Sequence, residues 1–292
     1  MIEQLVNGIV LGSMYALIAQ GYTLVFGVLD KLNFAHGEVF MLGGFLCLAS
    51  LALGAPVLLA VLAAVVAAAV LGLLVEFVGF RAFRSRDAQV TAALSSFAIG
   101  LVLIDGAQKV WGTEPRALDL PAALGATITV GGVRLVVLRL VVLAVALGLM
   151  AALHVLVTRS RLGRQIRAVA EDPVKAALFG VDVRRVTQAV FAIASGLAGL
   201  AGAAMALRTG YASSDVGFTF GLKSLAIMAI GGMGDLRGAL GGGLLVGVVE
   251  AAAFGAGFGQ FADLLVWLFM IAVLLVRPSG LFGAALARDV RA

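Results

Sequence analysis

Long apolar runs, separated by short polar segments, make up most of the chain. A helix needs about 20 mostly apolar residues to cross the hydrocarbon core of a bilayer. The predicted spans are Leu5–Leu29, Gly37–Gly54, Val57–Val78, Val90–Ala107, Leu135–Val157, Val186–Leu207, Ala239–Phe258 and Leu264–Val276. A shorter apolar piece, Ser224–Met233, leads into the glycine-rich sequence GGMGDLRG and is predicted to form either a short ninth span or a re-entrant element.

The composition indicates that lipid is the solvent of this chain. Hydrophobic residues make up 62% of the sequence, charged residues only 13%, and the mean hydropathy is +1.11. A soluble domain carries about 25% charged residues, so this chain has too few polar groups to cover a water-facing surface. We therefore predict an all-α polytopic membrane protein with eight or nine transmembrane helices, folded as a single transmembrane domain over residues 1–292.

Lysine and arginine are distributed unevenly between the segments that join the spans. The richer segments hold Arg81, Arg84, Arg86, Arg159, Arg161, Arg164, Arg167, Lys175, Arg184, Arg185, Arg288 and Arg291. The intervening segments hold Lys109, Arg116, Arg134, Arg208 and Lys223. Because basic residues accumulate in cytoplasmic loops, we predict the N-terminus outside and the C-terminus in the cytoplasm. This arrangement needs an odd number of crossings after Leu207, which favours a real, short crossing at Ser224–Met233.

One predicted external segment, residues 108–134, is long enough to have structure of its own. Its sequence GATITVGGVRL alternates apolar and polar residues around Gly131 and Gly132, which indicates a small hairpin. We interpret the segment as an ordered cap on the outer face, with a docking surface for an external partner as the alternative. Inside the spans, glycines four residues apart, such as Gly8 with Gly12 and Gly243 with Gly247, predict close helix packing.

Several polar residues lie inside or at the ends of the spans. Charges at membrane depth tend to face bundle interiors or water-filled paths. The candidates for a translocation path are Asn33, His36, Glu38, Asp105 and Glu250. Asn33 and His36 have a structural alternative, which is to cap the start of the next helix. Glu76 is expected to reach water beside Arg81. Asp263 lies near the outer end of its span, and its position fits both a translocation path and contact with water.

Motifs for catalysis or nucleotide binding are missing from the sequence. A phosphate-binding Walker A loop needs Gly-Lys followed by Ser or Thr, and no Gly-Lys pair occurs. There is no His-Glu-x-x-His motif, and Ser195, although followed by Gly196, is preceded by Ile193 and Ala194 instead of the glycine that a nucleophile turn needs. Two histidines and one cysteine, all far apart, make a metal site improbable. We therefore expect no catalytic residue, no metal and no directly bound cofactor.

The segment Gly163–Val186 is compact and polar in an otherwise apolar chain. Within it, Asp172 suits a helix N-cap, Pro173 the first helical position and Gly180 the left-handed C-terminal position. Apolar residues recur on one face at Val174, Ala177, Leu178 and Val181. The preceding Arg164, Gln165 and Arg167 are expected to prolong the previous span into the cytoplasm. The short helix is either an interfacial helix on lipid headgroups or a rigid element that docks on a soluble partner.

Three blocks of sequence, in the same order, resemble the permease subunits of branched-chain amino-acid ABC importers. They are NGIVLGSMYALIAQGYTLVFGVLDKLNFAHGEVFMLGGF near the N-terminus, the loop GRQIRAVAEDPVKAALFGVDVRRV, and LAIMAIGGMGDLRGALGGGLLVGVVE followed by RPSGLFG. The length and the early start of the first block resemble the shorter of the family's two paired permease types. The resemblance implies that residues 158–185 form a cytoplasmic loop that couples the permease to an ATPase. The residues expected to couple are Arg164, Arg167, Ala168, Ala170, Glu171, Asp172, Pro173, Ala176, Ala177 and Gly180.

The same resemblance implies a function and a set of partners. We expect a multi-pass subunit of the bacterial inner membrane that imports leucine, isoleucine and valine by alternating access. It would assemble with a second, homologous permease, two ATPase subunits that carry ATP and magnesium, and an extracytoplasmic binding protein. Permeases for urea and short-chain amides share these motifs and are the first alternative. A stand-alone secondary transporter driven by protons or ions is the second. Under each of these readings, the chain is expected to contact membrane lipid and no nucleic acid.

Overall fold

The computed structural model describes residues 2–83, 88–118, 122–130 and 133–282. Four arginines of the predicted cytoplasmic set, Arg84, Arg86, Arg288 and Arg291, lie outside the described residues, as does the predicted hairpin turn at 131–132.

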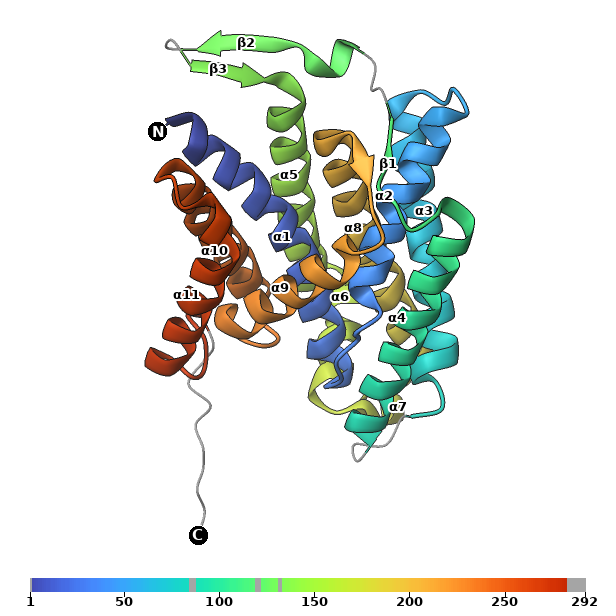
Figure 1. Ribbon diagram of the computed structural model, residues 1–292. Helices are drawn as coiled ribbons and strands as arrows, with labels where there is room; N and C mark the ends of the chain where they lie inside the picture. Colours follow the sequence, from blue (N-terminus) through green and yellow to red (C-terminus); the bar gives the residue numbers. More distant parts are fainter. Residues whose placement is uncertain (1, 84–87, 119–121, 131–132, 283–292) are drawn as a thin grey trace.

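Apolar helices packed side by side form most of the described structure (Figure 1). Seven of them are long and apolar enough to cross a membrane, and two more are apolar but shorter. The seven are α1 (Ile2–Leu29), α3 (Val57–Val75, continued by a π-helical turn at Glu76–Phe80), α4 (Gln89–Trp111), α5 (Val137–Arg159), α8 (Val183–Thr209), α10 (Leu236–Gly255) and α11 (Ala262–Val276, preceded by a 3₁₀ turn at Gly259–Phe261). The shorter pair is α2 (His36–Ala52) and α9 (Val216–Gly231). The predicted all-α polytopic membrane fold is confirmed.

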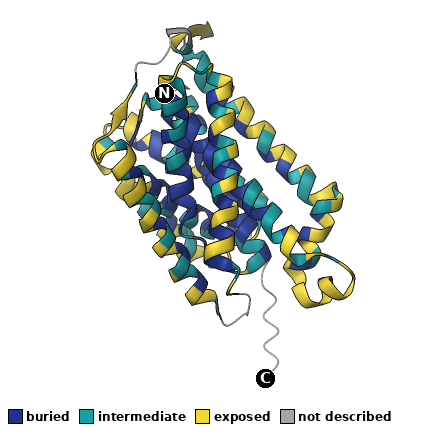
Figure 2. Cartoon of the chain, turned by 90° about the vertical axis from the view of Figure 1, so that its right-hand side faces the viewer, coloured by how far each residue is buried: buried dark blue, intermediate teal, exposed yellow. Residues whose placement is uncertain are grey.

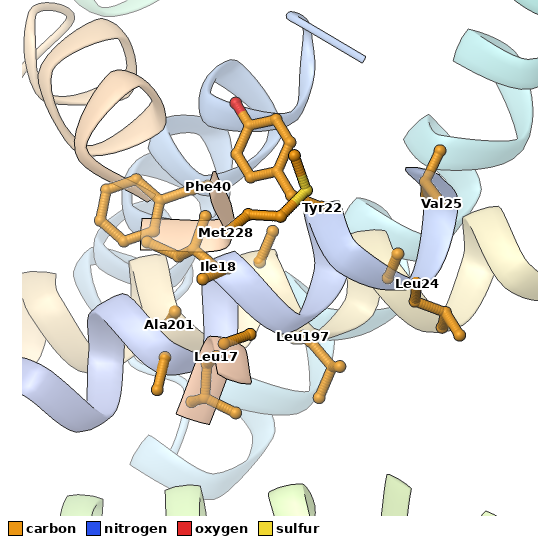
Figure 3. Close-up of a cluster of buried hydrophobic side chains, with 14 of the residues drawn as sticks. Leu17, Ile18, Tyr22, Leu24, Val25, Phe40, Leu197, Ala201 and Met228 are labelled. Carbon is orange, nitrogen blue, oxygen red and sulfur yellow. The ribbon is translucent and has the colours of Figure 1, made fainter. Parts of the chain in front are cut away.

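The helices differ in how far they are buried. Helices α1 and α8 are buried along most of their lengths, whereas α3, α4, α5 and α11 expose apolar side chains outward (Figure 2). A helix that is apolar on all sides is typical of a membrane span. In the centre, Leu17, Ile18 and Tyr22 of α1 lie with Phe40 of α2 and Met228 of α9 in one buried cluster (Figure 3).

Glycines allow the central helices to cross with their backbones in contact. At the crossing of α1 and α10, a Cβ atom on Gly12 would lie 2.8 Å from the carbonyl oxygen of Gly243, and Gly8 meets Gly247 in the same way. At the crossing of α2 and α8, a Cβ atom on Gly202 would overlap the carbonyl oxygen of Phe40. Small residues at helix interfaces let backbones approach in lipid, so the predicted packing role of the glycines is confirmed.

Replacing Gly202 by alanine is expected to destabilise the crossing of α2 and α8. The added methyl group has no space, and overpacking of this kind costs about 1–3 kcal/mol. The matched control is Gly148→Ala in α5, because a Cβ atom at Gly148 meets nothing within 4 Å. Thermal unfolding of the detergent-solubilised protein should show a lower Tm for Gly202→Ala only. Equal melting temperatures for both variants would contradict the packing argument.

The short apolar piece predicted at Ser224–Met233 is part of a longer helix. Helix α9 begins at Val216 and ends at Gly231, so the helical segment starts eight positions earlier than predicted. Lys223, which was assigned to an external loop, lies inside α9 and is buried. The charge of Lys223 interrupts the apolar pattern, so the pattern placed the start of the helix too late. The carboxylates that make its burial possible lie on other helices and leave no local signal.

The polar segment between α5 and α8 forms two separate short helices. They are α6 (Arg161–Glu171) and α7 (Pro173–Leu178). The expectation that Arg164 and Arg167 prolong the preceding span is wrong, because α5 ends at Arg159 and the Ser160 side chain accepts a 2.8 Å hydrogen bond from the Gly163 N–H to start α6. The prediction of a capped helix that starts at Pro173 is confirmed.

The predicted hairpin is present, and a second small sheet accompanies it. Strands β2 (Thr127–Val130) and β3 (Val133–Val136) pair antiparallel after a 3₁₀ turn at Ala122–Gly125. Strand β1 (Arg116–Ala117) pairs with β4 (Tyr211–Ala212), which follows α8 and was not predicted. The structured segment is shorter than 108–134, because α4 continues to Trp111.

The two ends of the bundle carry different structures. The N-terminus and the hairpin of β2 and β3 lie at one end, and α7 lies at the other, on the side where the chain leaves α11 (Figure 1).

Candidate functional site

The first turns of α2 and α9 meet inside the bundle. Helix α1 continues to Leu29, yet α2 begins at His36 beside Gly21, eight residues before the end of α1. At 1.5 Å per residue this is about 12 Å, so residues 30–35 return into the bundle before α2 starts. A Cβ atom on Gly221 of α9 would lie 3.0 Å from the Cα atom of Gly37. Two helices therefore begin side by side within the membrane part of the chain.

Glu38 lies at this junction and is buried. Its side chain lies against Gly217 of α9 and Gly100 of α4, and its Oε2 atom has no hydrogen-bond partner among the described residues. A small cavity of about 70 Å³ adjoins it, lined by Tyr22, Phe34, Glu38, Phe97, Leu101 and Phe218, among others. Glu38, a predicted path residue, therefore provides a polar side chain in the wall of a mostly apolar cavity.

Asn33 and His36 lie at the same junction and are also buried. The His36 ring is 4.6 Å from the Tyr22 ring, and both of its nitrogens lack partners among the described residues. Neither side chain caps α2, since the N-cap residue is Ala35 and receives no side-chain hydrogen bond. The capping alternative is therefore wrong. Helix α2 starts inside the bundle without a side-chain cap, and helices interrupted at this depth are typical of transport sites.

A second polar cluster joins four helices. Lys223 of α9 lies 2.6 Å from Asp263 of α11 and 3.4 Å from Glu250 of α10. The Tyr15 hydroxyl of α1 donates to Glu250 at 2.9 Å and accepts from Lys223 at 3.2 Å. Glu250 was predicted as a path residue. Lys223 and Tyr15 were missed, although a lone lysine followed by two acids in neighbouring apolar runs was a usable signal.

The remaining acids lie elsewhere. Asp105 does not join Glu38 or Glu250; its side chain is 63% exposed and forms a 2.6 Å ion pair with Lys109 one turn further along α4. Glu76 does not reach water as expected but is buried, because it lies four residues after Gly72 and so continues the buried face of α3. The structure thus separates the predicted path residues into a junction (Asn33, His36, Glu38), a cluster (Glu250) and an exposed pair (Asp105).

Helix α7 is held by local caps. The Asp172 carboxylate accepts hydrogen bonds from the N–H groups of Val174 (2.9 Å) and Lys175 (3.0 Å), and Gly180 has a left-handed φ of 81°. The backbone hydrogen bond from Lys175 is the main reason that the pKa of Asp172 lies below its ordinary value. This fixes the short helix without help from another subunit.

The pair α6 and α7 has an inner and an outer side. Gly163, Ile166, Val169 and Ala176 are buried against the rest of the chain. Arg164, Arg167, Ala170, Glu171, Pro173, Ala177 and Gly180 are exposed, while Ala168 and Asp172 are half-buried. Arg167 donates to the Val157 carbonyl and so ties α6 to the end of α5. The outer side also carries Leu178 and Phe179, which are 81% and 88% exposed. Of the predicted coupling residues, Ala176 packs inward.

Known proteins match nearly the whole chain. The family described as "Branched-chain amino acid transport system / permease component" matches residues 4–274. The high-affinity branched-chain amino acid transport system permease protein BraD of Pseudomonas aeruginosa is 33% identical, with 97% of this chain and 95% of BraD covered. The corresponding protein LivH of Escherichia coli (strain K12) is 32% identical with the same coverage. LivM of that organism is 31% identical over 42% of this chain and 29% of its own length.

Proposed function

Because the chain belongs to the family of permease components of branched-chain amino acid transport systems, we propose that it is the membrane subunit of an ATP-driven importer of leucine, isoleucine and valine. The observation that carries the proposal is the pair α6 and α7, a capped element in the polar segment between α5 and α8 that exposes Leu178 and Phe179. An element fixed this way transmits a push from a soluble subunit to the helices on either side.

The proposed assembly contains two permeases, two ATPases and a binding protein. The ATPases carry ATP and magnesium and dock on α6 and α7 in the cytoplasm. The second permease is a homologue, and the partial similarity to LivM supports a paired arrangement. The binding protein docks on the outer face, where the hairpin of β2 and β3 lies. The N-terminus is then outside and the C-terminus is in the cytoplasm of a bacterial cell.

The mechanism follows from the position of α6 between two spans. Closure of the ATPase dimer moves α7, and α6 passes the movement to α5 through the contact of Arg167 with Val157. The spans tilt, and the junction of α2 and α9 opens alternately to the two sides. Import of urea or short-chain amides by the same mechanism is the first alternative, and uptake by the isolated chain driven by a proton gradient is the second.

The exchange Glu171→Lys tests the coupling role. Glu171 is the exposed last residue of α6, beside the Asp172 cap. The exchange removes the carboxylate that this surface offers to the ATPase and puts a cation in its place, so leucine uptake into proteoliposomes should fall at least tenfold while the permease still inserts. The matched control is Glu3→Lys, an exposed acid near the N-terminus, which should leave uptake unchanged. Unchanged uptake in Glu171→Lys would remove the coupling role from this surface.

A further inference from the structure

We propose that the cavity at the junction of α2 and α9 binds the ammonium group of the transported amino acid, and that Glu38 recognises it. This inference rests on the proposed function, because it takes amino acids as the cargo. It adds the residue, the place in the bundle and the chemical group of the substrate that is bound there.

The first argument is the missing partner of Glu38. The residue is 3% exposed, and its Oε2 atom meets no donor among the described residues. The residues that line the cavity include no lysine or arginine, and Lys223 on the same helix α9 is held by Glu250 and Asp263 instead. A buried carboxylate is costly unless an opposite charge and hydrogen-bond donors compensate it. A ligand ammonium group supplies both.

The second argument is the position of Glu38 in α2. It lies in the first turn of that helix, where the helix dipole favours negative charge. The first turn of α9 lies against it as well, through Gly217. The two helix starts therefore offset part of the cost of a negative charge at this buried position.

The third argument is that glycines keep the space around Glu38 open. A Cβ atom on Gly217 would overlap the Glu38 carboxylate, and one on Gly100 would lie 3.5 Å from the Glu38 Cγ atom. A Cβ atom on Gly221 would lie 3.3 Å from the Tyr22 hydroxyl. Any larger residue at these positions would fill the hollow or displace the polar groups that face it.

The fourth argument is the chemistry of the remaining walls. Apart from Glu38, the Tyr22 hydroxyl and glycine backbone, the lining is apolar and includes Phe97, Leu101 and Phe218. These three side chains are half-exposed, so the hollow is reached from the surface of the subunit. At about 70 Å³ the cavity holds the ammonium group and its nearest atoms, and an aliphatic side chain extends along the apolar walls.

The test is uptake of labelled leucine by the assembled complex with Glu38→Gln. The amide keeps the size of the side chain but replaces a charge-assisted hydrogen bond by a neutral one, so uptake should fall about tenfold to a hundredfold. The matched control is Glu76→Gln. Glu76 is equally buried and its Oε2 atom also lacks a partner among the described residues, but it does not line the cavity. The control should transport like the wild type at equal amounts of assembled complex.

A binding measurement keeps the inference independent of turnover. Leu101→Cys places a thiol at the mouth of the cavity, and the native Cys47 is fully buried and should not react. Leucine should slow maleimide labelling of this thiol, whereas 4-methylpentanoate, the same carbon skeleton without the ammonium group, should not. In Leu101→Cys combined with Glu38→Gln, leucine should lose its protective effect.

The outcomes separate the inference from the proposed function. Wild-type uptake of leucine together with undiminished uptake by Glu38→Gln overturns the inference alone. Equal protection by leucine and 4-methylpentanoate overturns it as well. The wild-type complex could instead hydrolyse ATP with its binding protein and import no leucine. That result would overturn the proposed substrate and, with it, the proposed ammonium site.

Discussion

Replacing Lys223 by methionine is expected to lower the free energy of unfolding by about 3–5 kcal/mol. The substitution removes the cation that Glu250 and Asp263 share and leaves Glu250 and the Tyr15 hydroxyl facing each other in the core. Breaking a buried pair on one side leaves an uncompensated charge. The expected result is a large loss of folded protein on heating in detergent, measured as a shift of Tm.

The controls distinguish a buried pair from an exposed one. Lys109→Met breaks the ion pair with Asp105, which has the same 2.6 Å separation but exposed side chains, and pairs of this kind contribute about 0–1 kcal/mol. The double exchange Lys223→Met with Glu250→Gln removes both buried charges and should recover part of the loss, since the Asp263 side chain reaches the surface. Equal shifts for Lys223→Met and Lys109→Met would show that the cluster does not hold the helices together.

Replacing Leu178 by aspartate is expected to abolish ATP-driven uptake without unfolding the permease. The side chain of Leu178 is 81% exposed, so the subunit alone loses no packing. In the assembly, an apolar anchor in the groove of a partner carries a large share of the binding free energy, about 2 kcal/mol or more for a central contact. The affinity of the ATPase for the permease should fall at least thirtyfold, which a pull-down titration in detergent measures.

A leucine at the other end of the bundle provides the comparison. Leu53, at the end of α2, is 89% exposed, and Leu53→Asp introduces the same charge far from α7. It should leave ATPase binding at the wild-type level. ATPase binding by Leu178→Asp that matches Leu53→Asp would exclude α7 as the docking element.

The sequence predicted most of the helices because lipid removes ambiguity. A long apolar run has only one way to satisfy its backbone in a bilayer, which is to form a helix. The cap of α7 was equally predictable, because Asp172, Pro173 and Gly180 act through local backbone geometry. The sequence predicted that small residues would allow close helix crossings, but it could not predict which residue each glycine contacts. Gly202, for example, meets Phe40 only because two helices distant in sequence pack together.

The errors share a physical cause. Lys223 interrupts an apolar pattern, so α9 was predicted to begin too late; its burial depends on acids supplied by α10 and α11. Glu76 was placed by its position at the end of a span, whereas it lies on the face of α3 that packs on the bundle. The junction of α2 and α9 combines segments about 180 residues apart, and no local pattern connects Glu38 with Gly217.

The central claim is that this chain moves amino acids only when ATPases drive it through α6 and α7. The most direct measurement is uptake of labelled leucine into proteoliposomes that contain the complete complex, with the binding protein outside the vesicle membrane and the ATPases supplied with ATP. The account predicts uptake that requires ATP, survives collapse of the proton gradient and is absent with the purified chain alone. Uptake by the purified chain driven by a proton gradient would contradict it.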